Sequence, residues 1–209
     1  MGIQSNLIFI VLSVLAIVSK YTSPNNLYRL FKLLPILFLI IWVASFGDIQ
    51  GNPYTRAILA GLCFSIIGDS LLLFPAQFKS GLFSFLIGHI WYMLGFLSSD
   101  WSLPMLPTLI ITILALGMFF QLYPTLEKLK IPVLVYIFMI AGMGITSFGR
   151  LDALQSFSAL IGSMGASLFM ISDGVLGWNK FKNPFNLAEG IILITYYSGQ
   201  WMIFYSTLM

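Results

Sequence analysis

Two aspartates lie inside apolar stretches of the sequence and are its strongest chemical signal. Asp69 ends the segment 61–69 and Asp173 ends the similar segment 165–173, in which every other residue is apolar or small. A carboxylate at bilayer depth costs several kcal/mol unless it is protonated, paired or hydrated. Two carboxyl groups in one dry pocket could act as proton donor and proton acceptor. We therefore expect both aspartates to be functional; the alternative is that each only hydrogen-bonds a neighbouring helix.

Further polar residues fall at helical spacing near the first aspartate. Gly61, Ser65 and Asp69 are four residues apart, so small residues line the helix face that carries the carboxylate. His89, which is the only histidine, shares a helix face with Tyr92. We expect Ser65, His89 and Tyr92 to orient the reacting groups or to bind substrate. A purely structural hydrogen bond between helices is the alternative for His89.

The last apolar segment carries a polar stripe that fits the wall of a pocket. Glu189, Tyr196 and Gln200 are spaced to share one helix face. Glu189 could instead be a solvated residue at a helix N-terminus, where negative charge is favourable. Lys32 lies in an earlier apolar segment, where it could neutralise an aspartate, bind a lipid phosphate or extend toward the headgroups. We include all four residues in the expected substrate-binding or orienting set.

The composition predicts an all-α integral membrane protein with one transmembrane domain, residues 1–209. The chain is 59% hydrophobic and 8% charged, whereas a soluble domain carries roughly 25% charged residues. Its mean hydropathy is +0.96. The segment 7–18 is expected to be a retained helix, because no basic residue precedes it. Eight transmembrane helices are predicted, at roughly 3–19, 28–46, 55–74, 81–98, 103–121, 131–147, 155–177 and 188–208.

Basic residues are distributed unequally among the connections between these segments. The first, third, fifth and seventh connections, with their helix ends, hold all of the lysines and arginines except Arg56 and Arg150. Because basic connections stay in the cytoplasm, both termini are expected on the non-cytoplasmic side. Asp69 and Asp173 would then each lie about five residues, on the order of 8 Å, from a cytoplasmic helix end. The active site is therefore expected to open toward the cytoplasmic half of the membrane.

The segments around the two aspartates resemble each other. Residues 65–72 are similar to residues 169–176, and a Phe-Lys pair follows each. The copies are four helices apart, so the chain could consist of two four-helix halves in a parallel repeat. Such a repeat would place Asp69 and Asp173 opposite one another. Chance similarity between apolar segments is the alternative.

The motifs of several common enzyme classes are missing from the sequence. It contains no HExxH, no GxSxG, no Walker loop and no cluster of histidine and cysteine. A single histidine cannot build a histidine-rich metal site, and no basic aromatic patch favours nucleic acid. We therefore expect no metal, no other cofactor and no nucleic-acid partner. The sequence leaves the oligomeric state open.

The order and spacing of these motifs, from Lys32 to Gln200, resemble the YhhN-like lysoplasmalogenase family of multi-spanning membrane proteins. The resemblance implies eight helices and hydrolysis of the vinyl-ether bond of lysoplasmalogens, which are lysophospholipids. The products would be a fatty aldehyde and glycerophosphoethanolamine or glycerophosphocholine. It also implies that Asp69 and Asp173 are catalytic. The resemblance is carried by residues 61–69, 78–85, 89–92, Pro132 with Tyr136, 165–173, 180–181 and 195–200.

This chemistry agrees with the two carboxyl groups found in the sequence. A vinyl ether is cleaved by protonation of its β-carbon, which gives an oxocarbenium ion that water then attacks. Glycosidases divide the work between two carboxyl groups in a similar way, through a similar transition state. A small proton-coupled transporter of an amphipathic or lipid substrate is the main alternative, because paired intramembrane acids suit it too. A metal-dependent lipid hydrolase is a third, and the single histidine disfavours it.

Overall fold

The computed structural model describes residues 2–22 and 25–209, and every regular element within them is helical. Eight long helices account for most of these residues, as predicted, and short 3-10 turns follow or join some of them. The eight helices are α1 (Ile3–Thr22), α2 (Asn25–Phe46), α3 (Pro53–Leu72), α4 (Phe78–Phe96), α5 (Met105–Leu122), α6 (Lys130–Leu154), α7 (Phe157–Phe181) and α8 (Ala188–Tyr205).

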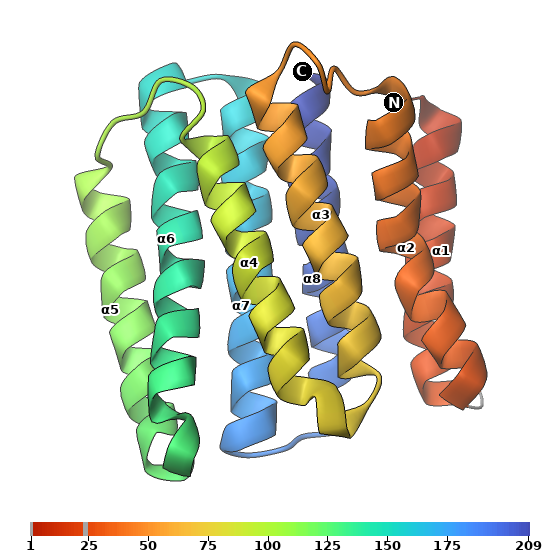
Figure 1. The fold of residues 1–209 in the computed structure, drawn as a ribbon, viewed down its shortest axis with the longest axis vertical. Helices are drawn as coiled ribbons and strands as arrows, with labels where there is room; N and C mark the ends of the chain where they lie inside the picture. The colour runs from red at the N-terminus through yellow and green to blue at the C-terminus, as the bar shows by residue number, and fades with distance from the viewer. Residues whose placement is uncertain (1, 23–24) are drawn as a thin grey trace.

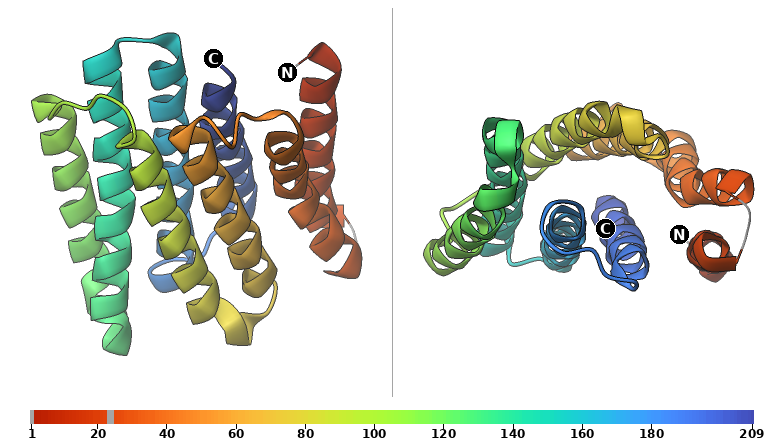
Figure 2. Two further views of the ribbon diagram at one scale, coloured as in Figure 1. Left: turned by 45° about the horizontal axis from the view of Figure 1, so that its top comes forward. Right: turned by 90° about the horizontal axis from the view of Figure 1, so that it is seen from below.

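The helices run side by side in an up-and-down bundle, with both termini at the same end (Figure 1). Seen from the other end, they form two rows (Figure 2). One row consists of α6, α4, α3 and α2, and the other of α5, α7, α8 and α1. The pairs α3–α4 and α7–α8 lie at the centre and pack most extensively. These central helices carry both aspartates.

Residues at the helix ends explain where several helices begin. The Asn52 side chain accepts a hydrogen bond from Tyr54 N, and Pro53 occupies the first position of α3. Ser156 caps α7 in the same way, by accepting a hydrogen bond from Ala159 N. These caps satisfy backbone donors that the first helical turn leaves free.

Glycines allow the central helices to approach each other closely. A Cβ on Gly61 would lie 2.2 Å from the Tyr92 ring, so this glycine leaves the space that the ring occupies. A Cβ on Gly165 would lie 2.8 Å from Gly199 O, because the two backbones touch at this point. Small residues at helix contacts serve the same purpose in other membrane bundles.

Six helices are long and apolar enough to cross a membrane, namely α1, α2, α3, α5, α6 and α7. The molecule is therefore a multi-pass integral membrane protein. The other two, α4 and α8, carry several of the polar residues singled out in the sequence. His89 and Tyr92 on α4 are fully buried, as is Gln200 on α8.

The two aspartates are not equally far from their helix ends, contrary to the expectation of about five residues for each. Helix α3 ends at Leu72, three residues after Asp69, and Pro75 follows shortly afterwards. Helix α7 continues to Phe181, eight residues after Asp173, because no proline interrupts it there. Asp69 is therefore on the order of 5 Å from its helix end, and Asp173 about 12 Å from its own.

Candidate functional site

A polar cavity opens at the end of the bundle opposite the two termini. Its volume is about 460 Å³, and residues from α1, α2, α3, α4, α7 and α8 line it. We call this cavity the polar basin. Asp69 and Asp173 both line it, as the sequence led us to expect of a common pocket. The other polar side chains in its wall are those of Lys20, Tyr28, Arg29, Lys32, Ser172, Asn179, Lys180, Glu189 and Tyr196.

Asp69 is paired with a cation. Lys32 Nζ on α2 lies 3.3 Å from Asp69 Oδ1, and both residues are buried. The Tyr196 hydroxyl on α8 donates a 2.6 Å hydrogen bond to Asp69 Oδ2. The Lys32 carbonyl in turn accepts a hydrogen bond from the Tyr197 hydroxyl at 2.9 Å. One ammonium and one hydroxyl therefore hold the Asp69 carboxylate in place from two other helices.

Asp173 has different partners. The Tyr136 hydroxyl on α6 donates a 2.6 Å hydrogen bond to Asp173 Oδ2, and His89 Nε2 lies 3.4 Å from the same oxygen. Among the described residues, neither ring nitrogen of His89 has a hydrogen-bond partner, although the side chain is fully buried. No lysine or arginine in the described part of the chain forms an ion pair with Asp173. The two aspartates therefore share a cavity but differ in charge environment.

Three of the expected site residues lie behind the wall of the basin. The Tyr92 hydroxyl donates to Gln200 Oε1 at 2.6 Å, and Gln200 Nε2 donates to Ser65 Oγ at 2.9 Å. All three side chains are buried. The network joins α3, α4 and α8 one helical turn from Asp69 and Tyr196. From this position the network is better placed to support the site than to contact a substrate.

The mouth of the basin is rich in positive charge. Glu189 lines it and forms an ion pair with Lys20 at 3.4 Å. Arg29 and Lys180 also line the basin, and neither pairs with a carboxylate of the described residues. Arg29 lies over an aromatic ring at 5.1 Å, and Lys180 does so at 4.7 Å. These two cations are available to bind an anion.

Sequence reasoning missed Tyr136 and Arg29 as site residues. One signal could have found Tyr136: the interval from Lys32 to Tyr136 equals the interval from Asp69 to Asp173. If the two halves correspond, Tyr136 takes the place of Lys32 in the second half. No such signal exists for Arg29. The structure also describes no group of three or more His, Cys, Asp or Glu side chains arranged to hold a metal ion within residues 2–22 and 25–209.

The sequence profile of the YhhN family matches residues 27–207, which include every residue of the site described above except Lys20. The chain belongs to the YhhN family. Lysoplasmalogenase TMEM86B of Homo sapiens is 34% identical over 186 residues, which cover 86% of this chain and 74% of that protein. Lysoplasmalogenase TMEM86A of Bos taurus is 31% identical over 190 residues, covering 87% and 78%.

A bacterial relative within the YhhN family matches most of both sequences. The uncharacterized membrane protein YhhN of Escherichia coli O157:H7 is 28% identical over 201 residues, covering 90% of this chain and 91% of that protein. No solved structure matches this YhhN-family chain.

Proposed function

We propose that this chain is a membrane lysoplasmalogenase. It would hydrolyse the vinyl-ether bond of a lysoplasmalogen to a fatty aldehyde and glycerophosphoethanolamine or glycerophosphocholine. The observation that carries the proposal is the pair of carboxyl groups, Asp69 and Asp173, in one cavity with unlike partners. The relatives named lysoplasmalogenases support the same substrate class.

The partners of the two aspartates suggest a role for each. The ammonium of Lys32 beside Asp69 favours the charged carboxylate, which can accept a proton from water. Asp173 has no such cation among the described residues, so its protonated form is less disfavoured and we assign it the role of proton donor. Tyr136 positions Asp173 through the hydrogen bond that its hydroxyl donates, and His89 Nε2 lies 3.4 Å from the same carboxylate oxygen. Two carboxyl groups with unlike environments can divide acid and base catalysis in this way.

The reaction then proceeds through four proton transfers that return both carboxyl groups to their starting states. Asp173 gives its proton to the β-carbon of the vinyl ether, and the alkene electron pair forms the new C–H bond. Water attacks the α-carbon of the oxocarbenium ion while Asp69 takes the proton that water loses. In the collapse of the hemiacetal, Asp69 returns this proton to the glycerol oxygen as the C–O bond breaks. The hemiacetal hydroxyl proton passes to Asp173, which restores both groups.

The phosphate of the headgroup would bind at the mouth of the basin. Lys32 was one candidate for this role, but it is engaged with Asp69. Arg29 and Lys180 have no carboxylate partner among the described residues and line the same cavity. Arginine and lysine both bind phosphate, and arginine can do so through two parallel hydrogen bonds. We therefore assign phosphate binding to Arg29 and Lys180.

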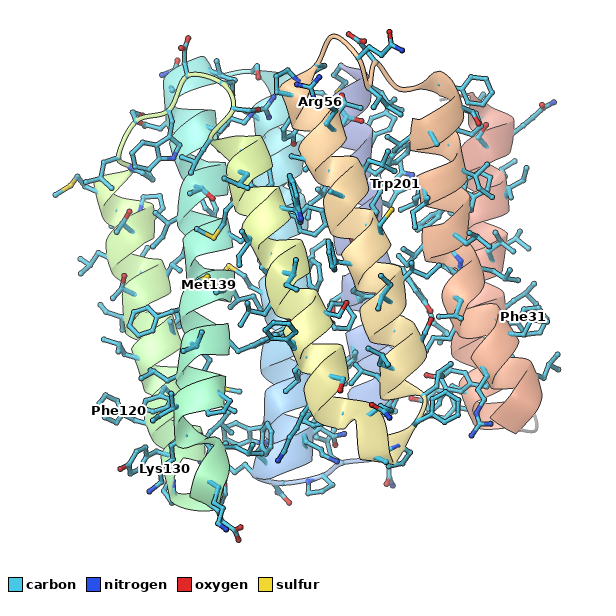
Figure 3. The ribbon with its side chains drawn as sticks, in the orientation of Figure 1. Phe31, Arg56, Phe120, Lys130, Met139 and Trp201 are labelled. Carbon is cyan, nitrogen blue, oxygen red and sulfur yellow. The ribbon has the colours of Figure 1, made fainter. Side chains whose placement is uncertain are left out.

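In this proposal all eight helices cross the membrane and the basin opens toward the cytoplasm. Helices α4 and α8 run alongside α3 and α7 for most of their length (Figure 1), which supports eight spans. Arg56 lies at the end with the termini, and Lys130 lies at the opposite end with most other basic residues (Figure 3). The positive-inside rule then puts the termini outside.

We also propose that the chain contains two corresponding four-helix halves. Lys32 on α2 contacts Asp69 on α3, and Tyr136 on α6 contacts Asp173 on α7, at equal sequence intervals. The central pair α3–α4 would correspond to α7–α8. In this arrangement a lysine in one half and a tyrosine in the other give equivalent carboxyl groups different roles.

The test is aldehyde release from a lysoplasmalogen by the purified protein, beside Asp69→Asn and Asp173→Asn. General acid–base catalysis typically contributes about 10²–10⁴-fold, so each variant should lose at least about 100-fold in turnover. Wild-type melting behaviour in detergent would show that the variants are folded. Wild-type protein without activity on any vinyl-ether lysolipid would overturn the proposal and favour a carrier.

A further inference from the structure

A second, apolar cavity lies between α4, α5, α6 and α7. Its volume is about 430 Å³, and we call it the apolar slot. It extends along α7 from Ser167 to Phe181, a distance of about 20 Å at the helical rise of ~1.5 Å per residue. Its walls are almost entirely hydrocarbon, and they include Ile111, Leu114, Met118, Ile137, Ile140 and Met170.

The apolar slot meets the polar basin at Asp173. Phe78, Asp173 and Leu176 line both cavities, whereas Asp69 lines only the basin. Asp173 is also the only charged residue in the wall of the slot, as far as the described residues show. The two cavities therefore adjoin at a carboxyl group, and together they outline a bent site with a polar arm and an apolar arm.

We propose that the apolar slot binds the single hydrocarbon chain of the lysolipid. This inference rests on the proposed function, because it states where the hydrocarbon chain of that substrate binds. From Asp173 the slot extends along α7 by about 9 Å to Ser167 and by about 12 Å to Phe181. It can therefore hold most of a chain that one leaflet of the ~30 Å hydrocarbon core accommodates within about 15 Å. A binding site lined by hydrocarbon with a carboxyl group in its wall suits a long apolar tail with a reactive group at one end.

The bent site fixes the direction in which the substrate lies. With the chain in the slot and the phosphate between Arg29 and Lys180, the vinyl ether crosses the junction. The β-carbon is then on the chain side, next to Asp173, and the α-carbon is on the headgroup side, toward Asp69. The shape of the site thus selects Asp173 as proton donor independently of the charge on Lys32.

Two glycines keep the slot open beside the junction. A Cβ on Gly174 would meet no atom within 4 Å, and one on Gly177 would first meet Leu122 at 3.5 Å. Both glycines line the slot. Helix α5 forms the outer wall at the edge of the bundle (Figure 2) and buries only three of its residues, so the chain can reach the slot from the lipid beside α5.

A larger residue at Gly174 tests this assignment. We expect Gly174→Leu to fill the slot next to Asp173 and to reduce turnover of long-chain lysoplasmalogens more than that of short-chain ones. The ratio of long-chain to short-chain aldehyde release should fall at least tenfold. Gly117→Leu on α5 is the matched control, because Gly117 is exposed outside the slot and its added side chain meets no neighbour. Equal loss at every chain length would overturn the inference.

A second measurement does not depend on turnover. A lysophosphatidylethanolamine with an ester-linked chain that carries a diazirine would be photolysed with the purified protein, and the labelled peptides sequenced. We expect labels on the slot-lining parts of α5, α6 and α7, reduced in Gly174→Leu and retained in Gly117→Leu. Labels unaffected by Gly174→Leu would refute the slot. If wild-type protein labels the slot but releases no aldehyde, the proposed function fails and the binding site stands.

Discussion

At the residue scale, the site depends on the unlike partners of two otherwise similar aspartates. Asp69 contacts a lysine and a tyrosine, and Asp173 contacts a tyrosine and a histidine. The sequence predicted both aspartates and several of their neighbours. It could not predict which aspartate Lys32 would contact, because shared faces within one helix do not determine which faces of different helices meet. Tyr136 could have been found only from its interval to Lys32, which equals the interval between the two aspartates.

Tyr136→Phe removes the hydroxyl that holds Asp173. This hydroxyl stabilises the negative charge that forms on Asp173 as its proton leaves. A hydrogen bond to a charged group contributes about 1.5–3 kcal/mol, so we expect kcat to fall about 10- to 100-fold with little change in KM. Tyr54→Phe is the control, because it removes a buried hydroxyl that contacts Ser206 at the other end of the bundle. Steady-state kinetics of both variants would measure the effect. Equal kcat in the two variants would contradict a positioning role for Tyr136.

Lys32→Met leaves the Asp69 carboxylate buried without its cation. Loss of one partner of a buried ion pair costs roughly 3–5 kcal/mol, so the melting temperature should fall clearly. The double variant Lys32→Met with Asp69→Asn should recover most of this stability, because no buried charge remains, while activity stays lost. Thermal unfolding in detergent would measure both. A Lys32→Met protein as stable as wild type would show that the pair does not form.

At the scale of the elements, helix contacts made by glycine set the geometry of the site. The sequence predicted all eight helices, since their apolar runs are long and clearly separated. It misplaced several ends, by seven residues at the end of α6, and it left open whether Ser65, Tyr92 and Gln200 bind substrate or orient the reacting groups. Those three side chains connect α3, α4 and α8. Polar residues that share a helix face can therefore pack against other helices as well as line the cavity.

Gly165→Val tests the contact between α7 and α8. Its Cβ would lie 2.8 Å from the backbone atoms Gly199 O and Ile203 N, so the helices must separate. Overpacking of this kind typically costs about 1–3 kcal/mol, and we expect a melting temperature several degrees lower. Gly117→Val on the exposed face of α5 adds the same side chain where a Cβ meets no atom within 4 Å, so the melting temperature should not change. Equal melting temperatures would show that α7 and α8 are not closely packed.

At the scale of the whole molecule, the bundle separates a basic end that holds the site from an end that holds both termini. Membrane-impermeant maleimide can test this orientation in intact cells, on a Cys63→Ser background. Gln50→Cys, in the connection from α2 to α3, should react, whereas Asn183→Cys, in the connection from α7 to α8, should not. Both positions are exposed. The reverse pattern would place the basin outside the cytoplasm.

The central claim is that the chain cleaves a vinyl ether by protonating its β-carbon. The most direct measurement is mass spectrometry of the aldehyde that the purified protein releases from a lysoplasmalogen in D₂O. Protonation at the β-carbon predicts an aldehyde with one deuterium on the carbon next to the carbonyl. Release of an aldehyde without this deuterium would contradict the mechanism, and no release of aldehyde would contradict the function.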